Sequence, residues 1–278
     1  MKPKTIAIAF YEETGATELA RAAAALAGHH GAHLLGLFVM PEIVRNAQLS
    51  IHVPPEVLHH ARAEHVRVSE QIETQFYEAA RREDVRSEWR NIDPDEDQTM
   101  ADALLDSARA ADLVLLGQPA PELRTAGQLH ETVIRNVGRP VLIVPHKEIG
   151  DGLHRSAVIG WSPTREATRA TFDTTGLLDA GARIRLLHVG RPDGRDLAEG
   201  PLNAMAEALA RHGFDVTVSY REPHAEKIVD VIEHEAAEHG GDFIATGAFG
   251  HSRAYDFIIG AVSWDLMTTA ERPVLFSK

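Results

Sequence analysis

Three segments of the chain occur twice, in the same order and at corresponding places in each half. Each contains a short apolar run of the kind that forms a buried β-strand. The matching pairs are residues 31–39 with 181–189, 111–117 with 241–247, and 139–144 with 272–277. A repeat of this length indicates two copies of one fold, and 278 residues are enough to bury two cores. We therefore predict two domains, at residues 1–147 and 152–278.

Between the apolar runs lie longer stretches in which apolar residues recur every three or four positions, which is the spacing of an amphipathic helix. In the first half we expect helices over residues 14–29, 55–82, 99–110 and 126–137. Short unbroken apolar strands that alternate with such helices are typical of a parallel sheet covered on both faces. The predicted fold class is α/β, with two tandem doubly wound parallel-sheet domains.

The last strand of each half follows an Arg-Pro pair and is predicted over residues 141–144 and 274–277. An apolar edge strand exposes unpaired backbone groups and promotes aggregation unless another strand covers it. We expect these two edges to pair within the chain, so that the halves pack as a pseudo-twofold dimer. The sequence leaves open whether whole chains also associate as a homodimer.

Composition excludes several classes of protein. The 28 Lys and Arg residues against 41 Asp and Glu give a net charge of -13, and no basic patch offsets it, so nucleic acid is not an expected partner. The chain has no cysteine, which removes disulfides, thiolate nucleophiles and cysteine-ligated metals. Only a short apolar run precedes Glu12 and Glu13, so neither a signal peptide nor a membrane span is predicted. We expect a soluble cytoplasmic protein with no membrane partner.

A glycine-rich loop follows the apolar run at residues 243–246. Its glycines, Gly247, Gly250 and Gly260, have the spacing Gly-x2-Gly-x9-Gly, and a helix is expected to open at Gly260. Glycine lets the backbone approach a ligand closely and turn its amides toward phosphate oxygens, and a helix N-terminus also favours anions. Doubly wound sheets bind ligands beyond the carboxyl ends of their strands, which is where this loop falls. The loop is therefore a predicted phosphate site.

The loop resembles the ATP-binding motif of the universal stress protein family. The flanking Gly-His-Ser-Arg of residues 250–253 and Arg-Pro-Val-Leu of residues 272–275 resemble tandem members of that family, and with the repeats the likeness covers nearly the whole chain. The resemblance implies a non-catalytic regulatory protein of the stress response that binds ATP, or a related adenine nucleotide, in its second half. The nucleotide-binding residues that we infer are Gly247, Gly250, Arg253, Gly260, Ser263, Ser162 and Val189.

Two positions depart from the family pattern. Ala261 follows the last glycine where ATP-binding members carry Ser or Thr, and Ser162 stands at the acidic position after the first strand of its half. Each altered polar contact weakens binding by on the order of 1 kcal/mol or more. The sequence therefore leaves two hypotheses: a weakened adenine-nucleotide site, or a nucleotide-free protein-interaction module with degenerate sites and unknown protein partners. A weak ATPase or a metal-dependent enzyme is a third and less favoured interpretation.

The first half departs further from the motif. After Gly117 its loop is three residues shorter and lacks the middle glycine, and Pro119 and Pro121 have no amide hydrogen to offer a phosphate. Glu12 and Glu13 follow the first strand, where inward-pointing charges would repel a nucleotide. We predict that this half binds no nucleotide.

No catalytic or metal-binding signature is present. The 16 histidines include two groups, one of His29, His30 and His33 and one of His52, His59, His60 and His65. Zinc signatures such as His-Glu-x-x-His are absent, so we expect these histidines on the surface and predict no metal site. No Gly-x-Ser-x-Gly elbow and no Gly-Lys-Ser/Thr loop occurs, so no catalytic residue is predicted. Trp161 is expected to be a packing aromatic beside the proposed cleft.

Overall fold

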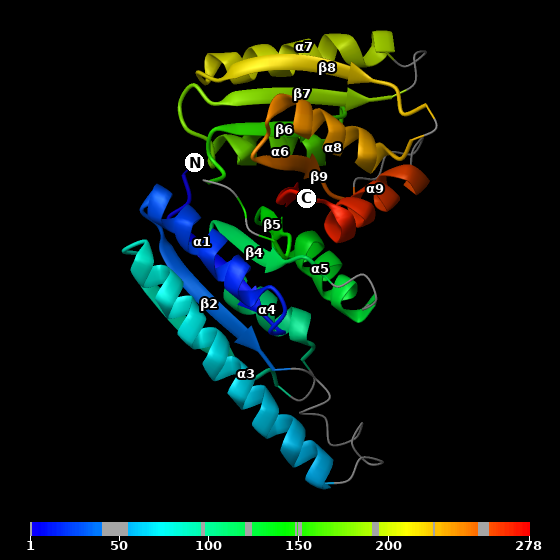
Figure 1. The fold of residues 1–278 in the computed structure, drawn as a ribbon. Helices are drawn as coiled ribbons and strands as arrows, with labels where there is room; N and C mark the ends of the chain where they lie inside the picture. The colour runs from blue at the N-terminus through cyan, green and yellow to red at the C-terminus, as the bar shows by residue number, and fades with distance from the viewer. Residues whose placement is uncertain are drawn as a thin grey trace.

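The computed structural model describes residues 2–40, 55–95, 98–119, 124–147, 149, 152–190, 195–224, 226–249 and 256–278 (Figure 1). The elements of the first half are β1 (Thr5–Phe10), α1 (Ala16–His30), β2 (His33–Val39), α3 (Pro55–Arg82), β3 (Ser87–Ile92), α4 (Met100–Ala108), β4 (Leu113–Gly117), α5 (Arg124–Asn136) and β5 (Val141–Val144). Those of the second half are β6 (Ser156–Gly160), α6 (Arg165–Thr175), β7 (Arg183–Val189), α7 (Arg195–Arg211), β8 (Asp215–Arg221), α8 (Ile228–His239), β9 (Phe243–Gly247), α9 (Asp256–Thr269) and β10 (Val274–Ser277).

These ten strands lie in one sheet, in the order β3-β2-β1-β4-β5-β10-β9-β6-β7-β8. Read outward from the centre, each half has the same order: its fifth strand, then its fourth, first, second and third. Neighbouring strands are parallel, except that β5 and β10 are antiparallel. The predicted α/β class and the pairing of the two last strands are confirmed. The division into domains at residues 1–147 and 152–278 stays a prediction.

The centre of the sheet is an antiparallel seam between β5 and β10. Leu142 lies opposite Leu275 across this seam, and both side chains are fully buried. Figure 1 places the C-terminus here, in the middle of the molecule. A second contact joins the halves, because the guanidinium carbon of Arg135 on α5 lies 4.0 Å from the centroid of the Phe249 ring. The seam thus covers both of the edges that the sequence identifies as apolar.

Two hydrophobic clusters cover the two faces of the sheet. One joins the strands to α1, α3, α6 and α7, and the other joins them to α4, α5, α8 and α9. Successive residues of a strand point to opposite faces, so Ile6 and Ile8 lie in the first cluster while Ala7 and Ala9 lie in the second. Each half therefore has two helices on each face, as in doubly wound folds.

The four helices expected in the first half agree with the structure to within two residues at each end. Local signals set these ends: α1 stops where Gly31 adopts a φ of 59°, and α4 starts after Thr99, whose side chain accepts a hydrogen bond from the Asp102 amide. No helix in the described part of the chain is long and apolar enough to cross a membrane.

Two expectations are wrong. The helix expected to open at Gly260 begins at Asp256, so Gly260 lies inside α9. A glycine in a helix interior costs only about 1 kcal/mol relative to alanine, which does not prevent a helix from continuing through it. His30 is not a surface residue, because it faces the core side of α1 and is 6% exposed.

Candidate functional site

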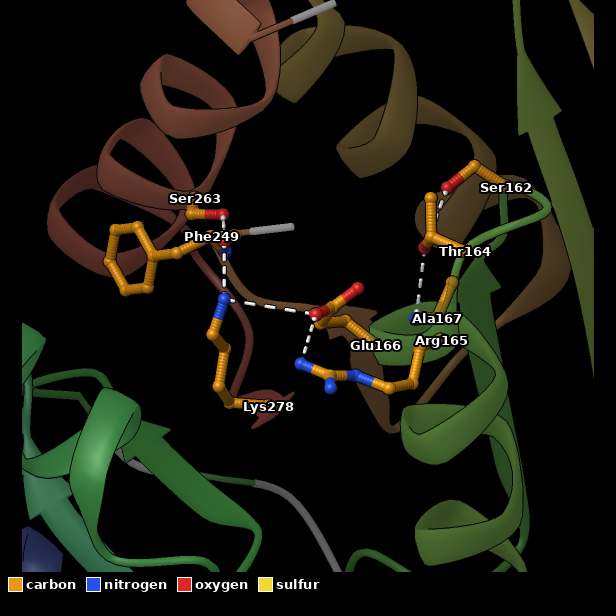
Figure 2. A network of polar contacts seen from close by, with 8 residues as sticks. All are labelled: Ser162, Thr164, Arg165, Glu166, Ala167, Phe249, Ser263 and Lys278. Carbon is orange, nitrogen blue, oxygen red and sulfur yellow. Dashed lines mark hydrogen bonds and ion pairs between the residues drawn. The ribbon is translucent and has the colours of Figure 1, made fainter. Parts of the chain in front are cut away.

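In the second half, the strand order changes direction between β6 and β9. The chain leaves β6 for α6 on one face of the sheet and leaves β9 for α9 on the other. Ligands of doubly wound sheets bind at such a switch point, beyond the carboxyl ends of the strands. Ser162 and Ser263 lie near this switch point (Figure 2), and Gly247 ends β9 beside it, so the structure brings three of the predicted site residues to one region.

Ser162 belongs to the turn that starts α6. The Thr164 side chain caps this helix by accepting a hydrogen bond from the Ala167 amide at 3.2 Å. The Ser162 hydroxyl lies 3.3 Å from the Thr164 hydroxyl. Because the two hydroxyls are partners, Ser162 supports the cap of α6 from inside the turn.

Gly247 ends β9 and lies directly against the first turn of α6. A Cβ built at this position would stand 2.5 Å from the backbone nitrogen of Ala167 and 2.6 Å from the carbonyl carbon of Glu166. Both distances are far below van der Waals contact, so any side chain at residue 247 would push the helix away from the strand. This glycine therefore has a packing role, whether or not a ligand is bound.

A buried acidic side chain occupies the same region. Glu166 is 7% exposed, and its carboxylate lies 3.0 Å from the Arg165 guanidinium and 3.7 Å from Nζ of Lys278. Burial by itself raises the pKa of this carboxyl, but a backbone hydrogen bond, Arg165 and Lys278 more than offset it and hold the pKa below its usual range. Glu166 is also in the first turn of α6, where a negative charge is favoured by the helix dipole.

Lys278 links this carboxylate to the start of the glycine loop. Its Nζ donates a hydrogen bond to the Phe249 carbonyl at 2.6 Å, and Figure 2 shows it between that carbonyl and Glu166. Phe249 has a φ of 48°, which non-glycine residues rarely adopt, and its amide donates to the Ser263 hydroxyl at 3.4 Å. The side chain of Ser263 is buried, so it serves the turn at Phe249 rather than an open surface.

The network contains no further predicted site residue among those that the structure describes. Gly250 and Arg253 lie outside the described residues, and Gly260 lies within α9. Val189 ends β7 and packs against the cluster on the α8 and α9 face. The structure therefore does not test whether these positions contact a ligand.

Trp161 is buried beside the turn, as expected for a packing aromatic. Its carbonyl accepts a hydrogen bond from Nδ1 of His188 at 3.1 Å, and burial lowers the pKa of that histidine. Within the described residues the Trp161 indole N–H has no hydrogen-bond partner. Trp161 also lines a groove of about 630 Å³ between α6 and α7, together with Pro163, Phe172 and Met205.

The corresponding switch point of the first half, between β1 and β4, is filled differently. The Tyr11 hydroxyl lies 3.4 Å from Nε2 of His130, and the same nitrogen lies 2.7 Å from the Gly117 carbonyl. Burial and the neighbouring Glu12 raise the pKa of the Tyr11 phenol. These side chains lie next to the strand ends, and the absence of a nucleotide from this half stays a prediction.

Sequence reasoning missed Glu166 and Lys278. An acidic residue in the first turn of a helix is usually a solvent-exposed partner of the helix dipole, so nothing marked Glu166 as buried. Lys278 follows the last strand by one residue, and a cation directly after a strand that ends near a switch point is the signal that was available.

Three solved structures are similar in fold over nearly the whole chain. A universal stress protein from Archaeoglobus fulgidus DSM 4304 matches with a TM-score of 0.74 and 14% identity, over 99% of this chain and 96% of that one. The fold is that of the universal stress proteins. A protein from Pseudomonas aeruginosa assigned to the universal stress proteins matches with a TM-score of 0.55 and 13% identity, over 99% and 93% of the two chains. A functionally unknown protein from Pseudomonas aeruginosa matches with a TM-score of 0.56 and 14% identity, over 99% and 92%.

No family model matches the sequence, and no curated protein does so. At 13–14% identity these structural matches establish the universal stress protein-like fold alone.

Proposed function

We propose that this chain is a non-catalytic regulatory protein of the universal stress protein type, which acts through its surface and holds no resident nucleotide. The observation that carries the proposal is the buried Glu166 carboxylate at the N-terminus of α6, paired with Lys278. In a nucleotide-binding switch point this region accepts an anion from the ligand. Here the protein supplies the anion itself.

Electrostatics argue against a phosphate beside this carboxylate. Two uncompensated like charges at 4 Å repel by about 4 kcal/mol at an effective dielectric constant of 20, and Arg165 and Lys278 reduce this repulsion in part. A phosphate would also have to compete with Glu166 and the Phe249 carbonyl for the Lys278 ammonium group. Gly247 packs against α6 and Ser263 accepts a hydrogen bond in the turn at Phe249. Both residues therefore have a structural role that needs no bound nucleotide.

The groove between α6 and α7 supports a role in protein interaction. It is lined mainly by apolar side chains, and one of them, Phe172, is exposed on the surface of α6. Exposed aromatic side chains in a groove are a common feature of surfaces that bind other proteins. A regulatory protein without a nucleotide would use a surface of this kind.

The second candidate is an adenine-nucleotide sensor, and two observations favour it. The glycine spacing at 247, 250 and 260 is complete, and the unpartnered Trp161 indole N–H is a buried donor beside the turn. In this candidate the Lys278 ammonium group leaves the Glu166 carboxylate and binds a phosphate oxygen of the nucleotide. The domain boundaries and a cytoplasmic location accompany both candidates as predictions.

One experiment separates the two. The freshly purified protein is denatured and any released nucleotide is identified by chromatography, and emptied protein is titrated with Mg-ATP by calorimetry. We expect no released nucleotide and no heat of binding. Released adenine nucleotide, or sub-millimolar binding that the Gly250→Val variant abolishes, would replace our proposal with the sensor.

Glu166→Gln sharpens the test. If the carboxylate excludes phosphate, removing its charge allows Mg-ATP binding that the wild-type protein does not show, whereas a sensor already binds Mg-ATP with Glu166 in place. Release of inorganic phosphate from Mg-ATP by the wild-type protein, absent from a Gly250→Val preparation, would refute the non-catalytic part of the proposal.

A further inference from the structure

Two histidines and one aspartate from three separate segments meet beside the C-terminus of α1. His29 is in the last turn of α1, His154 precedes β6, and Asp179 lies between α6 and β7. Each offers one ligand atom, and these atoms lie within 4.8 Å of one another. The cluster joins the first half to the second, because His29 and Asp179 are 150 residues apart in the sequence.

The distances suit one metal ion. Nε2 of His29 lies 2.9 Å from a carboxylate oxygen of Asp179, and Nε2 of His154 lies 3.9 Å from the other oxygen. In a tetrahedral zinc site with bonds of 2.0–2.1 Å, neighbouring ligand atoms are about 3.3 Å apart. The distance between His29 and Asp179 is close to this value, and all three ligand atoms lie within 4.8 Å of one another.

The surrounding backbone holds the three side chains in place. The Asp179 amide donates a hydrogen bond to the His154 carbonyl at 2.9 Å, so the two loops are joined directly. The His154 ring lies against the backbone at Gly152, where a Cβ would stand 2.5 Å from the ring, and stacks on the His29 ring at 3.9 Å between centroids. Buried leucines next to these residues, Leu153, Leu177 and Leu178, anchor both loops in the core.

Among the residues that the structure describes, a buried histidine without a hydrogen-bond partner lies next to the cluster. His30 is buried beside His29, with ring centroids 4.9 Å apart, and neither of its ring nitrogens has a hydrogen-bond partner within the described residues. Buried polar groups normally have partners, so an unpartnered imidazole next to two further histidines calls for an explanation. The C-terminus of a helix also favours a cation, whereas Lys2 is a positive charge that acts on Asp179 and opposes one.

We propose that His29, His154 and Asp179 bind one divalent transition-metal ion, for which Zn²⁺ is the reference, and that this ion clasps the two halves of the chain together. Two imidazoles and one carboxylate are a ligand set typical of zinc with one coordination position left for water. A single carboxylate is too few oxygen ligands for Ca²⁺ or Mg²⁺. On binding, the two stacked rings tilt so that their nitrogen lone pairs converge on the ion.

The clasp has a consequence for stability that is independent of any nucleotide. An ion that binds only the folded state stabilises it in proportion to the logarithm of ion concentration over Kd. Its ligands come from both halves, so the ion resists their separation directly. Metal availability would thereby control how firmly the halves are joined.

The test uses full-length protein freed of metal with a chelator and titrated with Zn²⁺ by calorimetry. We expect one site in the wild-type protein, with affinity at least 10-fold lower in His29→Ala, His154→Ala and Asp179→Asn. His234→Ala is the matched control, because His234 is an exposed histidine 4.0 Å from a carboxylate and belongs to no group of three possible metal ligands among the described residues. That control keeps the wild-type affinity.

Two further measurements distinguish the loss of a metal ligand from poor folding of a variant. Co²⁺ in a tetrahedral site absorbs strongly in the visible range, and we expect this band in the wild-type protein and in His234→Ala but not in Asp179→Asn. Zn²⁺ should raise the thermal unfolding midpoint of the wild-type protein and of His234→Ala. It should not raise the midpoint of a variant that lacks one of the three ligands. Equal binding and equal midpoint shifts in Asp179→Asn and His234→Ala would overturn the proposal.

Discussion

Gly247 lies so close to α6 that a Cβ at this position would stand 2.5 Å from the backbone nitrogen of Ala167. The first glycine of the loop is therefore required by the contact between a strand end and a helix N-terminus. Such a contact depends on backbone atoms, which cannot move aside as a flexible side chain can. The requirement exists even in a protein that never meets a nucleotide.

We expect Gly247→Ala to lower the free energy of unfolding by roughly 1–3 kcal/mol, the usual cost of overpacking. Gly117→Ala is the matched control, because Gly117 ends the corresponding strand of the first half and its nearest atom to a new Cβ is 3.6 Å away. Urea unfolding of both variants makes the comparison. Equal stability of the two variants would show that α6 shifts without cost.

Glu166→Gln should destabilise the protein in a pH-dependent way. The pKa of this carboxyl is lowered in the folded state, so its contribution is present above the unfolded value of about 4.3 and is lost as the pH falls through the folded pKa. At pH 7 we expect a loss of roughly 1–3 kcal/mol. The difference from the wild-type protein should shrink below about pH 4.

Urea unfolding at several pH values measures this difference. Glu207→Gln serves as the comparison, because Glu207 pairs with Arg211 on the exposed surface of α7 and such pairs contribute about 0–1 kcal/mol. A stability gap for Glu166→Gln that is the same at pH 7 and at pH 3 would contradict the assignment.

Lys278→Met tests whether Lys278 and Glu166 act as a pair. Residues in direct contact show coupling energies of about 0.5–3 kcal/mol in double-mutant cycles. We expect the Glu166→Gln/Lys278→Met double variant to be more stable than the sum of the single effects predicts. Either single change already breaks the ion pair, so the second change cannot break it again. Strict additivity in denaturant unfolding would mean that Lys278 serves only the Phe249 carbonyl.

Leu275→Ala tests the seam. Leu275 is fully buried opposite Leu142, and truncating a buried leucine costs about 2–5 kcal/mol. Because the seam joins the halves into one sheet, we expect a single shifted unfolding transition by circular dichroism and by tryptophan fluorescence. Val57→Ala, at an exposed site on α3, should change stability by no more than about 0.5 kcal/mol. Two separated transitions in the wild-type protein would show that the halves unfold independently.

The fold was largely predictable because it depends on local and repeated patterns. The run Thr5–Phe10 is apolar at every position after the first, as a strand covered on both faces has to be, and its counterpart before Gly160 has the same character. The seam was predictable for a related reason, since two apolar edges in one chain need a cover.

The candidate site was less predictable, because its contacts join residues that are distant in the sequence. The glycine spacing at residues 247–260 is the same for a phosphate loop and for a packed turn, and the close contact of Gly247 with Ala167 becomes visible only in the structure. His29 gives no local sign of its contact with Asp179, which exists only once the halves are placed side by side.

The seam also determines what is left at the two outer borders of the sheet. Both apolar last strands are taken up in the centre, so the free borders are β3 and β8, which carry charged side chains such as Glu88, Arg90, Asp215 and Arg221. Charged borders discourage the addition of further strands from neighbouring molecules. In the part of the chain that the structure describes, the sheet therefore ends in two charged strands, which disfavour its growth by edge-to-edge association.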